Sequence, residues 1–408
     1  MLTSSRRKFL ASTAAASGVL TFGKMAPAVL QQAAATGDDD GRILVVVELA
    51  GGNDGINSVV PFKDDAYLKA RPKLAIAPND VLKVTDELGF HPGLSGFAEL
   101  LEEGNLAVVQ GVGYENPNRS HFESMDIWHT CQRKNENRSD GWLGRFLEAT
   151  SAGDLSDPVA LHLGSDKQPF ALMSRDVRVP SIGSLDEFRL TGSSRANFRT
   201  AVKSLADATR TQSNDLLGFV QSSTSSAIAA SERIESAGMK YKPAAEYPAN
   251  GLAAKLKTTA KLINSGLGTR IYYMQINGFD THSQQANAHA ALLRQVSSAV
   301  TAFVNDMIAH GQGERVMCMC FSEFGRRVAE NASAGTDHGT AGPVFLAGTH
   351  AKAGLIGAKP GLADLTNGDL KHHTDFRQVY ATVLSKWLSC DTQAALKGTF
   401  EPVDAILS

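Results

Sequence analysis

The sequence RIYYMQINGFDTH, residues 270–282, is the stretch that indicates the fold of this chain. Its first half has the apolar and aromatic character of a buried strand. Its second half places Asp280 and His282 just after that strand. In an open α/β sheet, ligands bind in the crevice beyond the carboxyl ends of the strands. The stretch therefore predicts a strand whose end contributes polar side chains to a site.

Two further strands are expected, and each leads into residues of the same kind. Residues 42–49 (RILVVVEL) form a nearly continuous apolar run, as in a strand buried on both faces, and they lead to Asp54 in GGNDG. Residues 315–321 (RVMCMCF) lead to Glu323, and a later loop, GTDHG, carries Asp337 and His338.

The segments between these strands have helical spacing of apolar residues, and they are listed by residue number: 94–101, 284–310 and 376–387. Further strands are expected at 106–111 and 343–347. Because strand, helix and strand in succession imply parallel crossover connections, the sequence predicts an α/β fold with a mostly parallel central sheet and helices on both faces. We expect one domain over 36–408, in which 151–268 is an inserted helical or cap segment.

The first 35 residues read as a signal peptide. Arg6 and Arg7 form a twin-arginine signature ahead of a mild apolar run that ends near Phe22, which is too short for a membrane span of roughly 20 residues. We expect export of the folded chain by the twin-arginine machinery, removal of residues 1–35, a periplasmic or secreted location and no transmembrane anchor in the mature form.

Composition excludes several classes of protein. Hydrophobic residues make up 43% and charged residues 20% of the chain, which is ordinary for a globular protein, and the formal net charge is −2. Without a basic run there is no electrostatic footprint for nucleic acid, so we expect no nucleic-acid partner. The four cysteines lack metal-type spacing and are predicted to be structural thiols.

Carboxylates and imidazoles follow several of the predicted strands, and these are side chains that bind divalent metal ions. We therefore expect a divalent metal site. The predicted ligands are Asp54, Asp280, His282, Glu323 and His338. In an extended segment Asp280 and His282 point to the same side. Other interpretations stay open: Asp54 as a turn former, Glu323 as an ion-pair partner of a nearby arginine, and the Asp337-His338 pair as a solvated turn.

Ser120 is the candidate nucleophile. It lies at the expected start of a helix, between Arg119 and His121, which could bind an oxyanion or a metal. The same serine would also serve as a helix cap. No Gly-x-Ser-x-Gly elbow and no phosphate-binding loop occurs in the sequence.

These motifs together resemble a known bacterial family, domain of unknown function 1501. The resemblance covers nearly all of the mature chain and rests on the twin-arginine start and on five motifs besides GFDTH: GGNDG at 51–55, RSHF at 119–122, GWLGR at 141–145, SEFGR at 322–326 and TDHG at 336–339. That family is grouped with the alkaline phosphatase-like superfamily, which includes sulfatases and cofactor-independent phosphoglycerate mutases.

The resemblance implies roles for individual residues. Asp54 resembles the superfamily's first metal ligand, and Ser120 its nucleophile. Asp280, His282 and His338 resemble the ligands of one metal site. Glu323 stands where the superfamily has the Asp of an Asp-His pair, but the next residue is Phe324, and the spacing from Asp280 to His282 is shorter than the common pattern. These departures favour a one-metal or degenerate site over a two-metal site.

The implied function is that of an exported, metal-dependent hydrolase of phosphate or sulfate esters with a serine nucleophile. Zn, Mn, Mg or Ca would be the cofactor, and the substrate would be a small-molecule or polymeric ester. The alternative is a non-catalytic secreted binding or assembly protein that retains the fold and one structural metal.

Overall fold

The computed structural model describes residues 41–150, 157–165, 167–183 and 241–407. The predicted signal peptide, 1–35, lies outside these residues. Within the part of the chain that the structure describes, no helix combines the length and the apolar character needed to cross a membrane.

A nine-stranded sheet forms the centre of the described residues. Its strands pair in the order β11-β5-β10-β9-β1-β8-β6-β7, and β14 pairs with β5. The bounds in that order are Gly354–Ile356, Leu106–Gly113, Gly342–Ala347, Val316–Phe321, Ile43–Ala50, Ile271–Asn277, Ala160–Leu163, Ser181–Ile182 and, for β14, Thr374–Asp375. Only β10 runs antiparallel to its neighbours. The prediction of a mostly parallel sheet is therefore confirmed.

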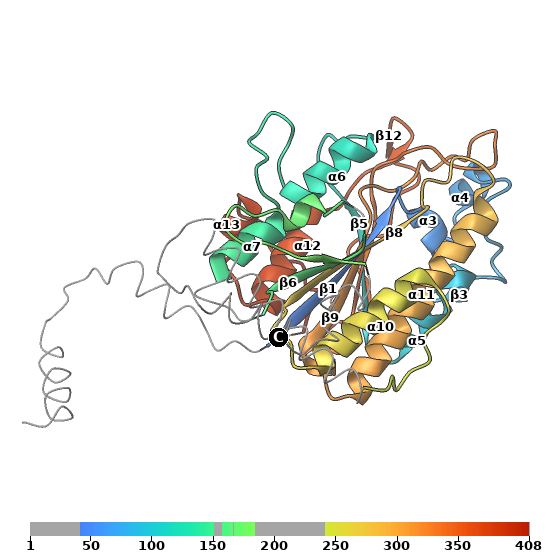
Figure 1. Ribbon diagram of the computed structural model, residues 1–408. Coiled ribbons are helices and arrows are strands. Elements are labelled where there is room, and N and C mark those ends of the chain that lie inside the picture. The colour runs from blue at the N-terminus through green and yellow to red at the C-terminus, as the bar shows by residue number, and fades with distance from the viewer. Residues whose placement is uncertain (1–40, 151–156, 166, 184–240, 408) are drawn as a thin grey trace, which may run out of the picture. The chain divides into compact units, whose positions relative to one another are not determined.

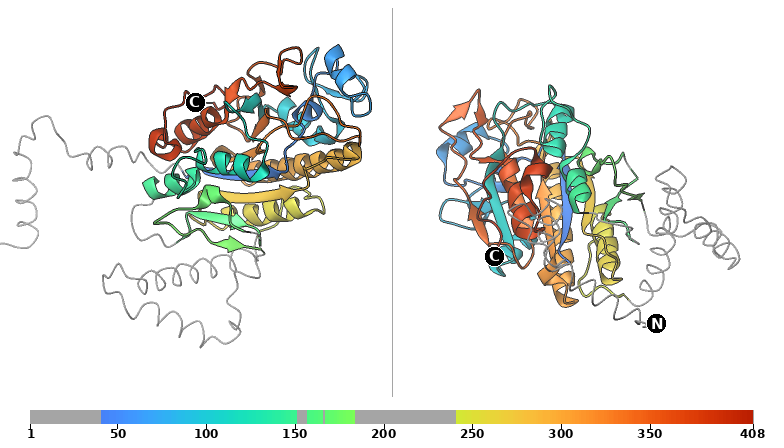
Figure 2. Two further views of the ribbon diagram at one scale, coloured as in Figure 1. Left: turned by 90° about the horizontal axis from the view of Figure 1, so that it is seen from above. Right: turned by 90° about the vertical axis from the view of Figure 1, so that its left-hand side faces the viewer.

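Helices cover both faces of this sheet (Figure 1; Figure 2 gives two further views). One face packs against α5 (Ser95–Glu102), α10 (Gly251–Asn264) and α11 (Gln285–Ala309). The other packs against α6 (His121–Thr130), α7 (Trp142–Thr150) and α12 (Phe376–Thr382). Along β1, Val45 and Val47 belong to the first core and Leu44 and Val46 to the second. This alternation explains why β1 is apolar at almost every position.

The strands β1, β8 and β9 are parallel neighbours and end at the same edge of the sheet. Ala50 lies opposite Asn277, and Glu48 lies opposite Phe321. The loops that follow them, 51–54, 278–284 and 322–341, therefore leave the sheet together. This common edge is where the polar motifs of the sequence meet.

Two glycines allow these loops to pack closely. Gly51 has a φ of 120° and Gly52 a φ of 84°, in the region that favours glycine. A Cβ on Gly51 would lie 2.3 Å from the backbone nitrogen of Asp280, and one on Gly52 would lie 2.4 Å from the ring of Phe324. Neither position has room for a larger residue.

Helix α6 is attached to the sheet by a buried carboxylate. Glu48 Oε2 lies 3.0 Å from His129 Nε2, in the last turn of α6, and accepts a hydrogen bond from the Tyr273 hydroxyl at 2.5 Å. Gln275 donates to the other oxygen at 2.8 Å. The ion pair and hydrogen bonds with His129, Tyr273 and Gln275 outweigh burial and lower the pKa of Glu48. The last turn of α6 is thus attached to β1 and β8.

Smaller elements complete the fold. A two-stranded hairpin joins β12 (Leu365–Thr366) to β13 (Asp369–Leu370). The four cysteines form no disulfide: Cys131, Cys318 and Cys320 are buried, and Cys390 is half-buried.

Part of the segment predicted as an insertion, 151–268, is described. Its strands β6 and β7 extend the central sheet, and α10 packs beside α11. Residues 151–156, 166 and 184–240 lie outside the described residues, so the insertion stays a prediction.

Candidate metal centre

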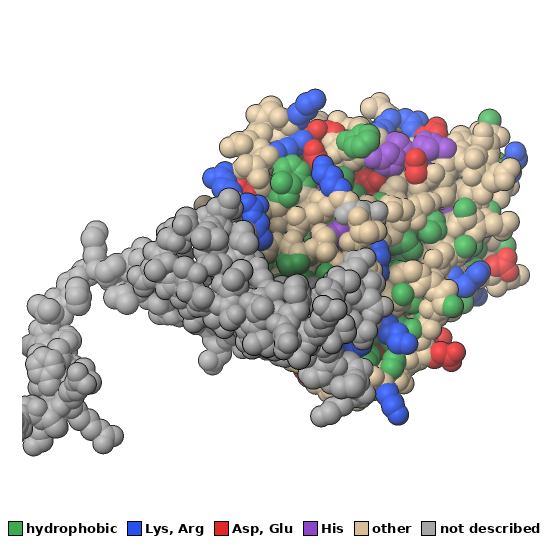
Figure 3. Space-filling view, viewed as in Figure 1, with side chains coloured by type: hydrophobic (Ala, Val, Ile, Leu, Met, Phe, Trp, Pro, Cys, Tyr) green, Lys and Arg blue, Asp and Glu red, His purple; other side chains and the backbone are tan. Residues whose placement is uncertain are grey.

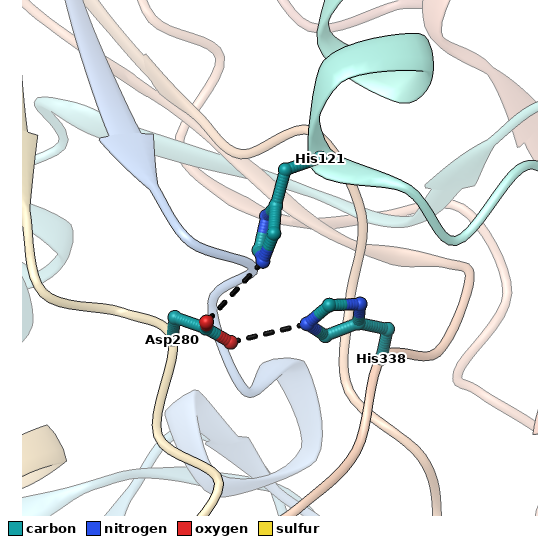
Figure 4. A group of neighbouring side chains, drawn as sticks. All are labelled: His121, Asp280 and His338. Atoms are coloured by element: carbon teal, nitrogen blue, oxygen red, sulfur yellow. Dashed lines mark hydrogen bonds and ion pairs between the residues drawn. The ribbon is translucent and has the colours of Figure 1, made fainter.

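Three side chains from separate segments of the chain meet at the carboxyl edge of the sheet. Asp280 follows β8, His121 is the first residue of α6, and His338 lies in the loop between β9 and β10 (Figure 4). Their ligand atoms lie within 4.8 Å of one another, which is close enough to share one ion. His282, two residues after Asp280, contacts two members of this group.

The Asp280 carboxylate is at the centre of the cluster. Its Oδ2 lies 3.4 Å from His121 Nε2, and its Oδ1 lies 3.1 Å from His338 Nε2. His282 Nε2 is 3.0 Å from the same Oδ1 and 2.9 Å from His338 Nε2. Three imidazoles thus direct the same ring atom toward one carboxylate.

Two of the rings are held from behind by strong acceptors. His121 Nδ1 lies 2.8 Å from Glu323 Oε1, an oxygen that also accepts from the backbone N–H of Gly51. His338 Nδ1 lies 2.7 Å from the backbone oxygen of Arg119, and a carbonyl oxygen can only accept. In its neutral form each ring therefore carries its proton on Nδ1, which leaves a lone pair on Nε2. This is the arrangement in which proteins present histidine to a metal.

The third ring is held in the same way but by a more exposed partner. His282 Nδ1 lies 3.1 Å from Asp337 Oδ1, and the Asp337 side chain is 56% exposed. Hydrogen bonds from Asn331 and His282 lower the pKa of Asp337. An ionised carboxylate accepts only, so this ring too carries its proton on Nδ1.

The cluster has more acceptors than donors. The Nε2 atoms of His282 and His338 face each other at 2.9 Å, and both are acceptors when their Nδ1 atoms are protonated. His121 Nε2 is buried and has no hydrogen-bond partner among the described residues. A buried polar atom without a partner is costly. A divalent cation would satisfy these lone pairs together with the Asp280 carboxylate, so the residues fit a metal ion.

One cation of the protein already contacts Asp280. Arg326 Nη2 donates to Asp280 Oδ1 at 2.6 Å, and the guanidinium is buried. It also donates to the backbone oxygens of Gly52 and Thr336, each at 2.8 Å, and of Phe279 at 2.9 Å. Arg326 thus binds the loops that follow β1, β8 and β9 to one another.

The electrostatic environment keeps the central carboxylate ionised. Burial acts to raise the pKa of Asp280, but the hydrogen bond and positive charge of Arg326, with the contact of His338, outweigh it and lower the pKa to about 2. The hydrogen bond to Glu323 raises the pKa of His121 against the opposing effect of burial. Burial lowers the pKa of His338, which favours the neutral, ligand form of that ring.

The cluster is open to solvent. The side-chain exposure is 46% for Asp280, 45% for His282, 32% for His121 and 21% for His338. Figure 3 shows histidine side chains gathered beside acidic ones on one face of the molecule. Structural metal sites are closed by protein ligands, whereas catalytic sites keep a position for water or substrate. The exposure of this cluster matches the second type.

Ser120 adjoins the cluster at the N-cap of α6. Its side chain makes no capping hydrogen bond, while its backbone N–H donates to Asn118 Oδ1 at 2.8 Å. It is exposed and lies between Arg119, whose carbonyl holds His338, and His121. The Arg119 guanidinium pairs with Asp369. Capping therefore does not occupy the hydroxyl that the sequence suggests as a nucleophile.

Asp54 has partners of its own and contacts none of the cluster's ligand atoms. Its Oδ2 lies 2.6 Å from Arg71 Nη1 and its Oδ1 3.1 Å from Arg71 Nη2, with both side chains fully buried. Gln285 donates to Oδ2. Burial acts to raise the pKa of Asp54, but Arg71 outweighs it and lowers the pKa. The predicted first ligand is instead one half of a closed ion pair.

Glu323 and Phe324 support the rings. Glu323 contacts the cluster through His121 Nδ1 and so takes the place of an orienting residue behind a ligand, whereas the sequence predicted a ligand. The Phe324 ring centroid lies 5.0 Å from that of His121 and 4.9 Å from that of His338. The residue that stands where the superfamily has a ligand therefore forms an apolar wall beside two imidazoles.

Two contacts in the cluster were not predicted from the sequence. His121 was expected to bind an oxyanion or a metal, but the pairing of its Nε2 with Asp280 and of its Nδ1 with Glu323 was not foreseen. Asp337 was considered beside His338 as a metal-binding or turn residue, whereas in the structure its carboxylate contacts His282 Nδ1. The position of His121 at the start of a helix, close to a strand end, indicated that it could belong to a site. The pairing with Asp280 could not be predicted because the two residues are far apart in the sequence.

Comparison with known proteins gives one family. The family model described as "Protein of unknown function (DUF1501)" matches residues 42–399. No curated protein matches the chain.

Several solved structures are similar to this chain at low identity. The C-terminal periplasmic domain of EcEptC from Escherichia coli, in complex with Zn, is 10% identical over 76% of this chain and 75% of that one, with a TM-score of 0.38. The PsFucS1 sulfatase from Pseudoalteromonas sp. is 10% identical over 89% and 70%, with a TM-score of 0.40. The lipoteichoic acid synthase LtaP from Listeria monocytogenes is 8% identical over 83% and 76%, with a TM-score of 0.36. These likenesses leave the function to be argued from the site itself.

Proposed function

This chain belongs to the DUF1501 family, and we propose that it is a metal-dependent hydrolase of phosphate or sulfate esters with Ser120 as its nucleophile. The observation that carries the proposal is the convergence of three imidazole Nε2 atoms on Asp280, with each ring held from behind by a protein acceptor. Histidines that only pack in a core need no such common target.

The ligand set that we propose is His121, Asp280, His282 and His338. Three imidazoles and one carboxylate suit zinc better than magnesium or calcium, which prefer oxygen ligands. Manganese stays a candidate because it accepts mixed nitrogen and oxygen ligands. Asp54 is left out of this set because both its oxygens are bound by Arg71.

When bound, the ion would act as a Lewis acid that stabilises negative charge on the transferred group. The Ser120 hydroxyl would give its proton to solvent and its Oγ would form a bond to the phosphorus or sulfur atom, while the bond to the alcohol oxygen breaks and that oxygen takes a proton from solvent. Water would then cleave the seryl ester, which releases phosphate or sulfate and restores the hydroxyl. Arg119 precedes Ser120, but its guanidinium is paired with Asp369, so it would add positive charge beside the anionic group only on leaving that pair.

The first test measures metal content. Protein purified without chelator is compared by elemental analysis with His121→Ala and with His350→Ala, a matched variant of a histidine that pairs with Glu314 away from the cluster. We expect about one ion per chain in the wild type and in His350→Ala, and a large loss in His121→Ala. Equal and negligible metal in all three would reject the metal centre.

The second test measures turnover. A panel of phosphate and sulfate monoesters is assayed with Zn, Mn, Mg and Ca, and Ser120→Ala should lower kcat by about 10² to 10⁴-fold, the range for loss of a positioned catalytic group. Turnover that survives in Ser120→Ala would instead assign the attack to water.

A second candidate is a non-catalytic secreted binding or assembly protein with one structural metal. The contact of Arg326 with Asp280 favours it, because the guanidinium partly neutralises the carboxylate without any ion. Bound metal without turnover on any ester would support this candidate over the hydrolase.

We also propose that residues 1–35 direct export of the folded chain to the periplasm or beyond through the twin-arginine machinery. The pair Arg6-Arg7 ahead of a mild apolar run supports this. Replacing both with Lys should retain the protein in the cytoplasm, as seen by cell fractionation. Unchanged export would reject the proposal.

A further inference from the structure

A cavity of about 680 Å³ lies beside the candidate metal centre. The loop between β5 and α6, residues 113–119, forms one wall, and residues 366–372 around the β12–β13 hairpin form the other. In Figure 1, β12 and α6 lie close together at the top of the view. The volume is within the range of small-molecule sites, roughly 300 to 1,000 Å³.

Arg119 belongs to both the cavity and the cluster. Its backbone oxygen accepts from His338 Nδ1 at 2.7 Å, while the residue lines the cavity. Ser120 is the next residue along the chain. The cavity therefore adjoins, along the chain, the residue that we propose as the nucleophile.

The charges that line the cavity are largely compensated. Arg119 pairs with Asp369, whose side chain is 1% exposed and whose Oδ1 is 3.7 Å from Arg327 Nε. Lys371 pairs with Asp364. Because these cations already have carboxylate partners, the lining is not suited to a second anionic group.

Uncharged hydrogen-bonding side chains make up much of the remaining lining. Within the described part of the chain, the side chains of Asn116, Thr366 and Asn367 make no hydrogen bond, and all three are exposed. An amide or hydroxyl of this kind both donates and accepts. Such side chains match vicinal hydroxyl groups, which also donate and accept.

Other classes of ligand fit less well. Tyr114 is the only lining residue with a phenyl-type ring, and it is engaged: the Arg133 guanidinium lies 5.6 Å from its centroid and Phe376 packs against it edge-on. A nucleobase would therefore lack a platform for stacking. Leu370 and Pro117 are the main apolar lining residues, which is too little for an acyl chain.

We propose that this cavity binds the alcohol part of the ester as a neutral, polyhydroxylated group of the sugar class. The inference rests on the proposed function for the ester, but binding of the sugar part can be measured without turnover.

The first experiment measures that binding on the full chain treated with chelator. Saturation-transfer NMR with the methyl glycosides of glucose, galactose and mannose should detect at least one of them, and Thr366→Val/Asn367→Leu should abolish the signal. The matched control is Asn264→Ala, whose amide bonds only to a carbonyl within α10. No transfer to any glycoside, or equal transfer to the double variant, would overturn the proposal.

The second experiment uses turnover to distinguish the two claims. The double variant should raise KM for a sugar phosphate by about tenfold, as for the loss of one or two hydrogen bonds, and leave kcat and the KM for phenyl phosphate unchanged. Equal changes for both esters would overturn the sugar site and leave the hydrolase intact. Glycoside binding without any turnover would retain the sugar site and reject the hydrolase.

Discussion

Asp54 and Asp280 follow neighbouring parallel strands at the same edge of the sheet, and yet their surroundings differ in kind. Asp54 is fully buried, and Arg71 binds both of its oxygens. Asp280 is 46% exposed, and three imidazoles and one guanidinium approach it. The first carboxylate has its cation built into the fold. The second lies among neutral ligand atoms that an added cation would satisfy.

Position after a strand therefore does not decide the role of an acidic residue. At Asp280 a guanidinium binds only Oδ1, whereas at Asp54 a buried guanidinium binds both oxygens. Arg71 does so from the end of α4 (Asp65–Ala70). Buried ion pairs are weak contributors to stability, but breaking one leaves an unpaired charge that costs much more.

The largest expected effect is therefore at Arg71. Arg71→Met should lower the free energy of unfolding by about 3 to 5 kcal/mol, because Asp54 would be left buried without a counter-ion. Urea denaturation measures the loss. The double variant Asp54→Asn/Arg71→Met removes both charges and should recover part of it. A loss below about 1 kcal/mol in Arg71→Met would mean that the pair is not as closed as the comparison requires.

The next effect separates the two carboxylates by metal. Zinc at 100 times its Kd should raise the free energy of unfolding of the wild type by about 2.7 kcal/mol. Asp280→Asn should lose this increment, whereas Asp54→Asn, although less stable throughout, should keep it. Denaturation with and without zinc gives both increments. The same increment in both variants would contradict the assignment of Asp280, and not Asp54, as a metal ligand.

A third effect is the pH dependence of stability that arises near the buried Asp54–Arg71 pair. Burial lowers the pKa of His289, which lies near Asp54 and is also faced by His91, Arg71 and Arg326, to about 4. An unfolded histidine titrates near 6.5, so the folded state binds fewer protons between these values. The contribution of the neutral His289 to the free energy of unfolding is therefore fully present above about pH 6.5. It falls as the pH is lowered, by about 2 kcal/mol between pH 7 and 5.

Denaturation in the presence of chelator, at both pH values, isolates this effect from metal binding. Burial also lowers the pKa of His91 to about 4, so this ring acts in the same direction. His289→Gln should reduce the pH dependence by the share of that ring. An unchanged slope in this variant would show that another group titrates.

The smallest effects are on zinc affinity. They distinguish the buried Glu323 from the exposed Asp337, the two carboxylates that orient histidine rings in the cluster. Glu323→Gln should weaken zinc binding by roughly 10 to 100-fold, as for other residues that orient a ligand. Asp337→Asn should change it by about twofold or less, because the side chain is 56% exposed and an amide oxygen still accepts from His282 Nδ1. Calorimetric titration compares the two. Equal losses of zinc affinity in the two variants would show that the exposure of an orienting carboxylate does not determine its effect on binding.

Most of the sheet could be predicted because its strands are apolar in the pattern of buried strands. The predicted strands 42–49, 270–276 and 315–321 are Ile43–Ala50, Ile271–Asn277 and Val316–Phe321. The long helix expected over 284–310 is Gln285–Ala309. Burial on one or both faces requires apolar residues at regular spacing, and these elements show that spacing clearly.

The site could be predicted only in part. The common edge of three strands brings Asp280, His282 and His338 together, as the motifs suggested. No pattern in the sequence indicated that Arg71 would reach Asp54. It also could not show that Glu323 would turn the His121 ring, because that contact joins residues 202 positions apart. Such choices depend on side-chain directions that a linear pattern does not encode.

The unpaired cysteines Cys131 and Cys390 have a consequence for how the folded chain behaves toward oxidants. Burial raises the pKa of Cys131 to about 12 and that of Cys390 to about 11, so both remain protonated thiols at neutral pH. Only the thiolate reacts readily with oxidants and disulfides. In the folded chain these two thiols should therefore resist oxidation in a reducing and in an oxidising environment alike.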